Sequence, residues 1–128
     1  MKALYLIVAC CLILTACGSK TKEIDHSTMV MDTDQKPTME VKTEVNGNEL
    51  MVDVTTDMKI SAEHYSKARE PGEGHIHMYL DDGEKITVKE GHKVFPGLTV
   101  GHHILKLSLH NNDHTPYDVT KTIEFEVK

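Results

Sequence analysis

The segment HIHMYLDDG, residues 75–83, joins the pattern of a β-strand to that of a turn. Its apolar residues occupy every second position, as in a strand that buries one face. These apolar positions are Ile76, Met78 and Leu80. The run Asp81-Asp82-Gly83 supplies residue types that favour a turn. We therefore predict a strand with an apolar core face and an outer face that begins with His75 and His77.

Six further segments carry alternating or short apolar runs, and turn residues separate them. They comprise residues 38–45, 49–56, 85–88, 92–95, 102–110 and 118–127. Asn46-Gly47 is a strong hairpin signal, and Pro96-Gly97 interrupts the chain before the sixth strand. Seven short strands in about 90 residues predict an all-β fold, an immunoglobulin-like antiparallel β-sandwich. Residues 61–69 leave room for at most one helical turn.

The first residues have the features of a bacterial export signal. Lys2 precedes a nearly unbroken apolar run, which is shorter than the ~20 residues of a comfortable membrane span. Leu14-Thr15-Ala16-Cys17, followed by Gly18-Ser19, resembles the lipobox of bacterial lipoproteins. The resemblance implies cleavage just before Cys17 and lipidation of that cysteine. An ordinary signal peptide or an uncleaved anchor is the alternative.

Such processing divides the chain into three parts. Residues 1–16 are the signal peptide, residues 17–37 are the lipidated cysteine with a flexible polar tether, and residues 38–128 are the sandwich domain. The tether contains side chains that could catch a soft metal ion, although a plain tether is the simpler interpretation. These side chains are His26, Met29 and Met31.

All three cysteines of the chain precede the predicted sandwich domain. Cys10 and Cys11 leave with the signal peptide, and the lipid blocks Cys17. We therefore expect neither a free thiol nor a disulfide in the domain, although disulfides are permitted outside the cell. A metal site there must use nitrogen, oxygen or thioether sulfur.

Composition narrows the function classes. Acidic residues outnumber Lys and Arg by 20 to 14, and the formal net charge is −6, which argues against nucleic acid as a partner. Tryptophan is absent and aromatic residues make up 5%, so a platform that stacks carbohydrate is not expected. Nine histidines in 128 residues are the outlier.

Four of these histidines are expected to meet at one end of the sandwich. In the immunoglobulin arrangement the third and sixth strands are antiparallel neighbours, so the start of one lies beside the end of the other. His75 and His77 begin the third strand, and His110 ends the sixth on its outer face. His114 lies in the turn that follows. We predict a metal site made of these four histidines, with a merely polar sheet edge as the alternative.

Other residues are weaker candidates for metal ligands. Imidazole donors suit copper, zinc, nickel and iron. Met78 is interpreted as a packing residue first and as a weak axial ligand second, while Met58 and His64 are possible further ligands. The remaining histidines of the domain are interpreted as a structural residue, His103, and as two surface residues, His92 and His102.

The run from residue 74 to residue 116 contains a His-x-His strand, an Asp-Gly turn, a glycine-rich corner with a histidine, and an Asn-x-x-His exit. It resembles the YtkA-like and FixH-like immunoglobulin-fold group of extracytoplasmic lipoproteins. The matching positions are His75, His77, Asp82, Gly83, Gly97, Gly101, His103, Asn111 and His114. The resemblance implies an extracytoplasmic location and a link with copper handling or oxidase assembly.

Two functions compete at this point. The first is a copper-binding protein, with zinc or another transition metal as the alternative, lipid-anchored on the extracytoplasmic side of the cell membrane and used for metal buffering, delivery or resistance. The second is an immunoglobulin-like interaction module that docks on a membrane or cell-envelope complex, with histidines that are incidental or sense pH. We expect no enzyme, because no Ser/His/Asp, Cys/His or paired-carboxylate constellation stands out.

Overall fold

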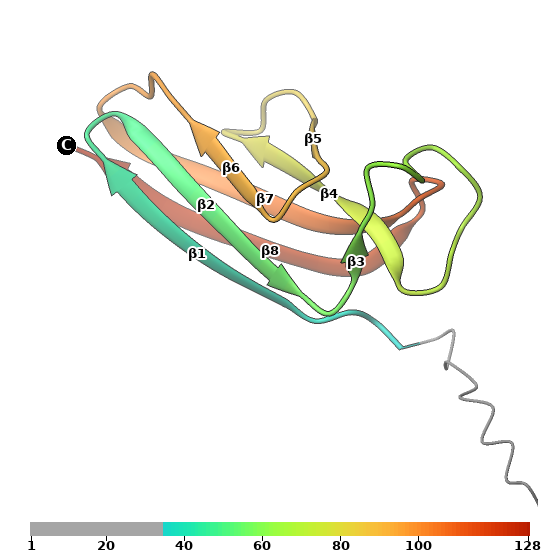
Figure 1. Ribbon diagram of the computed structural model, residues 1–128. Helices are drawn as coiled ribbons and strands as arrows, with labels where there is room; N and C mark the ends of the chain where they lie inside the picture. Colours follow the sequence, from blue (N-terminus) through green and yellow to red (C-terminus); the bar gives the residue numbers. More distant parts are fainter. Residues whose placement is uncertain (1–34) are drawn as a thin grey trace, which may run out of the picture.

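Two β-sheets packed face to face form residues 35–128, the part of the chain that the computed structural model describes (Figure 1). One sheet has the order β1 (Met39–Asn46), β2 (Glu49–Thr56), β6 (His92–Phe95). The other has the order β3 (Lys59–Ile60), β4 (Glu73–Leu80), β7 (Gly101–Asn111), β8 (Pro116–Val127), with β5 (Ile86–Val88) paired to β4. The predicted signal peptide, Cys17 and most of the predicted tether lie outside the described residues.

The predicted all-β immunoglobulin-like sandwich is confirmed, with two differences in detail. The two-residue strand β3, parallel to β4, was not predicted, because so short a strand has no periodicity to detect. Residues 61–69 form turns instead of a helical turn. Among residues 35–128, no helix is long and apolar enough to cross a membrane.

Alternating side chains from both sheets meet in one core. Leu50 and Val52 of β2 face Ile76 and Met78 of β4 across the layers, together with three leucines of β7. Met78 is therefore a core residue, as its position in the strand predicted. Large-to-small substitutions in such a core cost roughly 2–5 kcal/mol, which makes this layer the main source of stability.

Strands β4 and β7 are antiparallel neighbours, as the sequence predicted. His75 lies opposite His110, and His77 lies opposite Ser108. Gly74 lies opposite Asn111 at the end of the ladder. The two strands therefore bring their histidines to one end of the outer face of the sheet.

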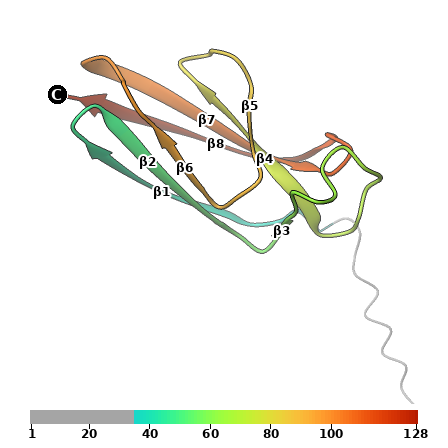
Figure 2. The same cartoon turned by 45° about the horizontal axis from the view of Figure 1, so that its top comes forward.

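A strap, defined as residues 61–72 between β3 and β4, passes over this end of the sheet (Figure 2). Its backbone is tied down where Ser61 donates to the Gly74 carbonyl at 2.9 Å and where Ser66 donates to the Asn112 carbonyl at 2.9 Å. The strap leaves His75 and His77 only 0% and 3% exposed. The two histidines lie on the outer face, as the strand period predicted, but that part of the face is buried, so substitution there is not neutral for stability.

The histidines outside the predicted site have the roles that the sequence indicated. His103 is buried at the start of β7, where Nδ1 lies 2.7 Å from the Asp81 carboxylate and Nε2 lies 2.7 Å from the Thr99 carbonyl. These two acceptors, Thr99 first, raise the pKa of His103. His92 and His102 are exposed and pair with carboxylates on neighbouring strands.

Candidate metal centre

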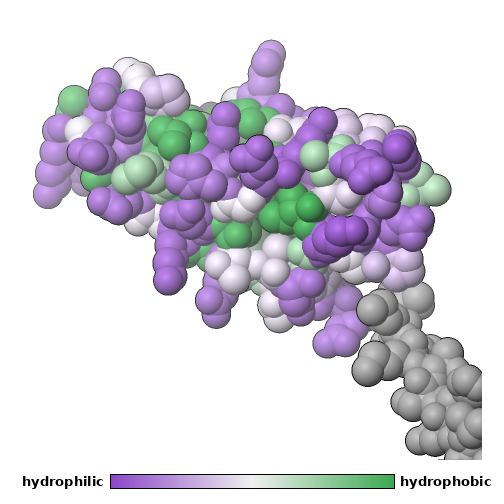
Figure 3. All heavy atoms as spheres, viewed as in Figure 1, coloured by the Kyte–Doolittle hydropathy of each residue, from purple (hydrophilic) through white to green (hydrophobic). Residues whose placement is uncertain are grey.

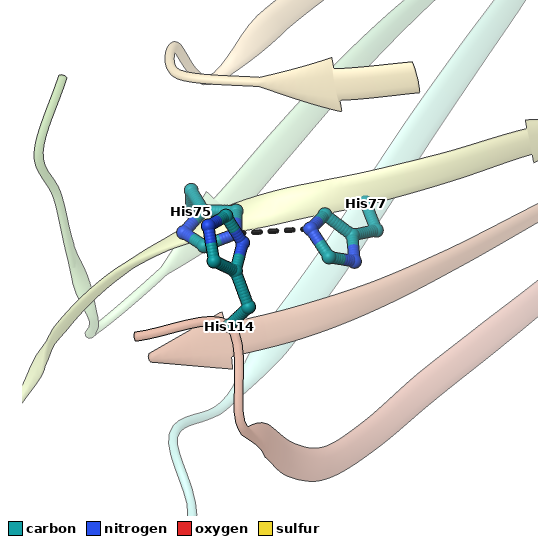
Figure 4. A group of neighbouring side chains, drawn as sticks. All are labelled: His75, His77 and His114. Atoms are coloured by element: carbon teal, nitrogen blue, oxygen red, sulfur yellow. Dashed lines mark hydrogen bonds between the residues drawn. The ribbon is translucent and has the colours of Figure 1, made fainter. Parts of the chain in front are cut away.

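Three imidazole rings converge at the start of β4 (Figure 4). His75 and His77 come from β4, and His114 comes from the turn between β7 and β8. The two Nε2 atoms of His75 and His77 are 2.9 Å apart, and Nδ1 of His114 is 3.2 Å from Nε2 of His75. One ring nitrogen from each residue lies within 4.8 Å of the other two. We call these residues the histidine trio.

Two of the three separations between the nitrogens are close to what one ion requires. Imidazole nitrogens bound to a tetrahedral zinc ion at about 2.0–2.1 Å lie roughly 3.3 Å from each other. The two short separations in the trio, 2.9 and 3.2 Å, are close to that value. Small shifts of the rings would therefore place three nitrogen donors around a single ion.

The turn after β7 holds His114 in an unusual backbone conformation. Its φ angle of 69° lies in the left-handed region, which side chains other than glycine and asparagine rarely adopt. Asn111 closes the turn by donating to the Thr115 carbonyl at 2.8 Å and accepting from the His114 amide at 3.0 Å. In this conformation the His114 ring lies against the two histidines of β4 (Figure 4).

His75 and His77 are buried, and both are electrically neutral at neutral pH. Burial, and then the positive charge of neighbouring histidines, lowers the pKa of His75 to about 4 and that of His77 to about 3. Nδ1 of His75 is buried without a hydrogen-bond partner, which is rare in native proteins. Neutral imidazoles are the form that binds metal ions, so His75 and His77 carry available lone pairs.

These pKa values predict acid sensitivity of the metal-free fold. In the unfolded chain both histidines have a pKa of about 6.5, so below that pH the unfolded state binds more protons than the folded state. The free energy of unfolding should then fall as the pH drops from about 6.5 towards 4, by at most about 1.4 kcal/mol per pH unit for each histidine. Urea unfolding at pH 7.5 and at pH 5, with a chelator present, measures this change in the free energy of unfolding. The same loss in a chain with His75→Leu and His77→Leu would contradict this origin.

His110, the fourth predicted ligand, lies beside the trio instead of facing into it. Its ring stacks on His77 with centroids 3.8 Å apart. Nδ1 donates to the His114 carbonyl at 3.0 Å, which leaves Nε2 to accept from the Ser108 hydroxyl at 2.9 Å. Both nitrogens are therefore engaged, and the geometry favours His110 as a support for the other rings.

The possible additional ligands lie elsewhere. Nδ1 of His64 donates to the Glu73 carboxylate at 2.6 Å, and Lys59 binds the same carboxylate. These bonds, Lys59 first, lower the pKa of Glu73 to about 2. Met58 is packed in the core beside Gly74, and Met78 is also a core residue. The described geometry thus assigns none of the three to the trio.

The sequence did not indicate two strap residues that contact the trio. The ring of Tyr65 contacts the rings of His75 and His114 edge-on, with centroids 4.9 Å apart in both pairs. Nζ of Lys89 lies over the Tyr65 ring, 3.8 Å from its centroid. Ser66 hydrogen-bonds Nε2 of His114 at 2.8 Å. The strap has no periodic pattern, so only the presence of an aromatic residue beside a histidine could have drawn attention to it.

Comparisons with known proteins give limited information. The chain matches no described protein family, and no curated protein matches it. It is similar in structure to the PKD1 domain of Vibrio anguillarum Epp, with 11% identity and a TM-score of 0.49 over 73% of this chain and 95% of that one. It is also similar in structure to the PKD1 domain from the Vibrio cholerae metalloprotease PrtV, with 14% identity and a TM-score of 0.49 over 73% of this chain and 98% of that one. The chemistry of the histidine trio is therefore the basis for a functional proposal.

Proposed function

We propose that the sandwich domain binds one transition-metal ion through His75, His77 and His114. The observation that carries the proposal is the convergence of three ring nitrogens, one from each residue, within 4.8 Å. The burial and neutrality of His75 and His77 support it, because neutral imidazole is the form that binds a metal ion. A chance cluster of surface histidines would have no reason to bury two of its rings as completely as those of His75 and His77.

Copper is the preferred metal, and zinc is the alternative. For a site made of nitrogen donors, affinity among divalent first-row ions peaks at Cu²⁺. The described domain offers no cysteine, so the thiolate ligands that select zinc or iron–sulfur clusters are missing from residues 35–128. Buffering, delivery or resistance are the roles that such a site would serve.

The metal-binding domain would work on the extracytoplasmic side of the cell membrane, held there by lipid on Cys17. Acyl chains contribute about 0.8 kcal/mol for each buried CH₂ group, so a cysteine with several chains would stay attached. Cys17→Ser should yield an unprocessed or released chain, assayed by its mass and by fractionation of the cells. Normal mass with full membrane retention would contradict the lipid anchor.

A docking module is the competing function. Docking through an apolar face would require a contiguous hydrophobic patch. The face seen in Figure 3 is mainly hydrophilic, and within residues 35–128 the large hydrophobic residues that are exposed are Val45 and Val100. Neither belongs to the strap or to the trio, so the surface offers less support for docking than the trio offers for metal binding.

Metal analysis separates the two functions. The full chain, extracted in detergent and carrying no histidine tag, should retain about one transition-metal ion per molecule, with copper preferred over zinc at equal free concentrations. Elemental analysis and native mass spectrometry measure the content. A chain that neither retains nor takes up copper or zinc would remove the proposal and leave docking as the better account.

A further inference from the structure

The two ring nitrogens of His114 have different surroundings. Nδ1 faces Nε2 of His75 at 3.2 Å, inside the trio. Nε2 faces outward and meets the hydroxyl of Ser66, in the strap, at 2.8 Å. A neutral imidazole carries one proton, so the choice of nitrogen that holds it decides whether Nδ1 presents a lone pair to an ion.

We propose that Ser66 is a positioning residue that keeps the proton of His114 on Nε2, an inference that rests on the proposed metal binding. The Ser66 hydroxyl oxygen accepts the Nε2–H, which leaves Nδ1 bare and aimed at the ion. Metal-bound histidines commonly donate their second N–H to such an acceptor, and loss of the acceptor typically costs 10–100-fold in metal affinity. The Ser66 hydroxyl, 2.8 Å from Nε2 of His114, lies where such an acceptor is needed.

The backbone of the strap holds the hydroxyl in position. Ser66 has a φ of 61°, in the left-handed region, and its amide donates to the Asn112 carbonyl at 2.9 Å. Asn112 lies two residues before His114 in the same turn. A second tie comes from Arg69, whose guanidinium binds the Thr115 hydroxyl and lies 3.8 Å from the Asp113 carboxylate. The ligand turn and the strap are thus one unit, and the site is complete only when the strap is seated.

Three substitutions separate positioning from simple anchoring of the strap. Ser66→Ala removes the acceptor at an exposed position, where the cost to folding is small. Ser66→Asn supplies another oxygen acceptor on a residue that tolerates positive φ. Arg69→Ala loosens the strap without touching the ring of His114. Each variant is compared with the unmodified full chain.

The first measurement is the ring ¹⁵N NMR spectrum of His114 in the metal-free and Zn²⁺-loaded chain. The unmodified chain should carry the proton on Nε2 in both states. Ser66→Ala should give a mixed population in the metal-free state, while Ser66→Asn and Arg69→Ala should keep the proton on Nε2. The second measurement is the Zn²⁺ dissociation constant, which should rise about 10–100-fold in Ser66→Ala and be at least partly restored in Ser66→Asn.

Other results would overturn the inference. A proton on Nδ1 of His114 in the unmodified chain would do so, and so would an unchanged spectrum and affinity in Ser66→Ala. If Arg69→Ala changed both the spectrum and the affinity as much as Ser66→Ala does, Ser66 would only hold the strap in place and would not position the proton. If no form binds metal, the proposed function fails, yet the metal-free spectra still decide whether Ser66 sets the proton position of His114.

Discussion

Replacing His77 with leucine should lower the affinity for Cu²⁺ and Zn²⁺ by more than about 100-fold, beyond what loss of a supporting hydrogen bond costs. The change removes one of three nitrogen donors and fills the buried space with an apolar side chain. Replacing His75 and His77 together should abolish specific binding, because a single imidazole remains. Titration against a coloured chelator of known affinity measures both effects at neutral pH.

Two controls show whether the effect belongs to the trio. His110→Phe keeps a flat ring stacked beside His77, and it should lower the affinity by no more than about 10-fold, as for a supporting residue. Substitution of the exposed His92 and His102 should leave the affinity unchanged. A loss in His110→Phe as large as in His77→Leu would instead support the four-histidine site that the sequence predicted.

Gly74→Ala should destabilise the domain by roughly 3–5 kcal/mol, among the large effects expected of a single substitution. A Cβ atom at Gly74 would lie 1.9 Å from the His110 carbonyl oxygen and 2.9 Å from Sδ of Met58. The backbone of β7 cannot yield by that amount while it stays paired with β4. The pairing that holds His75 would therefore open, and metal binding should be lost with it.

Gly72→Ala is the matched control for this prediction. No atom lies within 4 Å of the added methyl group at Gly72, and only its φ of 72° opposes a side chain. The left-handed backbone should cost about 1–2 kcal/mol there. Chemical denaturation of both variants measures the difference. Equal stability of Gly74→Ala and the unmodified chain would contradict the tight approach of β4 and β7.

The sequence predicted those parts of the site that depend on strand geometry. A period of two placed His75 and His77 on one face, and the neighbour rule for immunoglobulin-like sheets placed His110 at the same end of that face. Both arguments depend only on the backbone repeat. For the same reason the core position of Met78 was predictable, since it alternates with the histidines.

The missing parts depend on irregular backbone. The strap covers the trio because Ser66 adopts a left-handed conformation and its amide bonds to the turn after β7. Neither feature produces a periodic pattern in the sequence. His114 turns inward through a similar conformation in its own turn. The engagement of both His110 nitrogens follows from contacts with Ser108 and the His114 carbonyl. The burial of His75 and His77 and the contact of Ser66 with His114 were therefore beyond prediction from the strand pattern.

A crystal structure of the copper- or zinc-loaded chain, with anomalous scattering recorded at the absorption edge of the metal, tests metal binding by the trio most directly. The expected result is one ion about 2.0–2.1 Å from Nε2 of His75, Nε2 of His77 and Nδ1 of His114. The ring of His110 should remain stacked on His77 without a bond to the metal. An ion bound only at exposed histidines such as His92 or His102, or a trio without metal at saturating concentration, would contradict the proposed site.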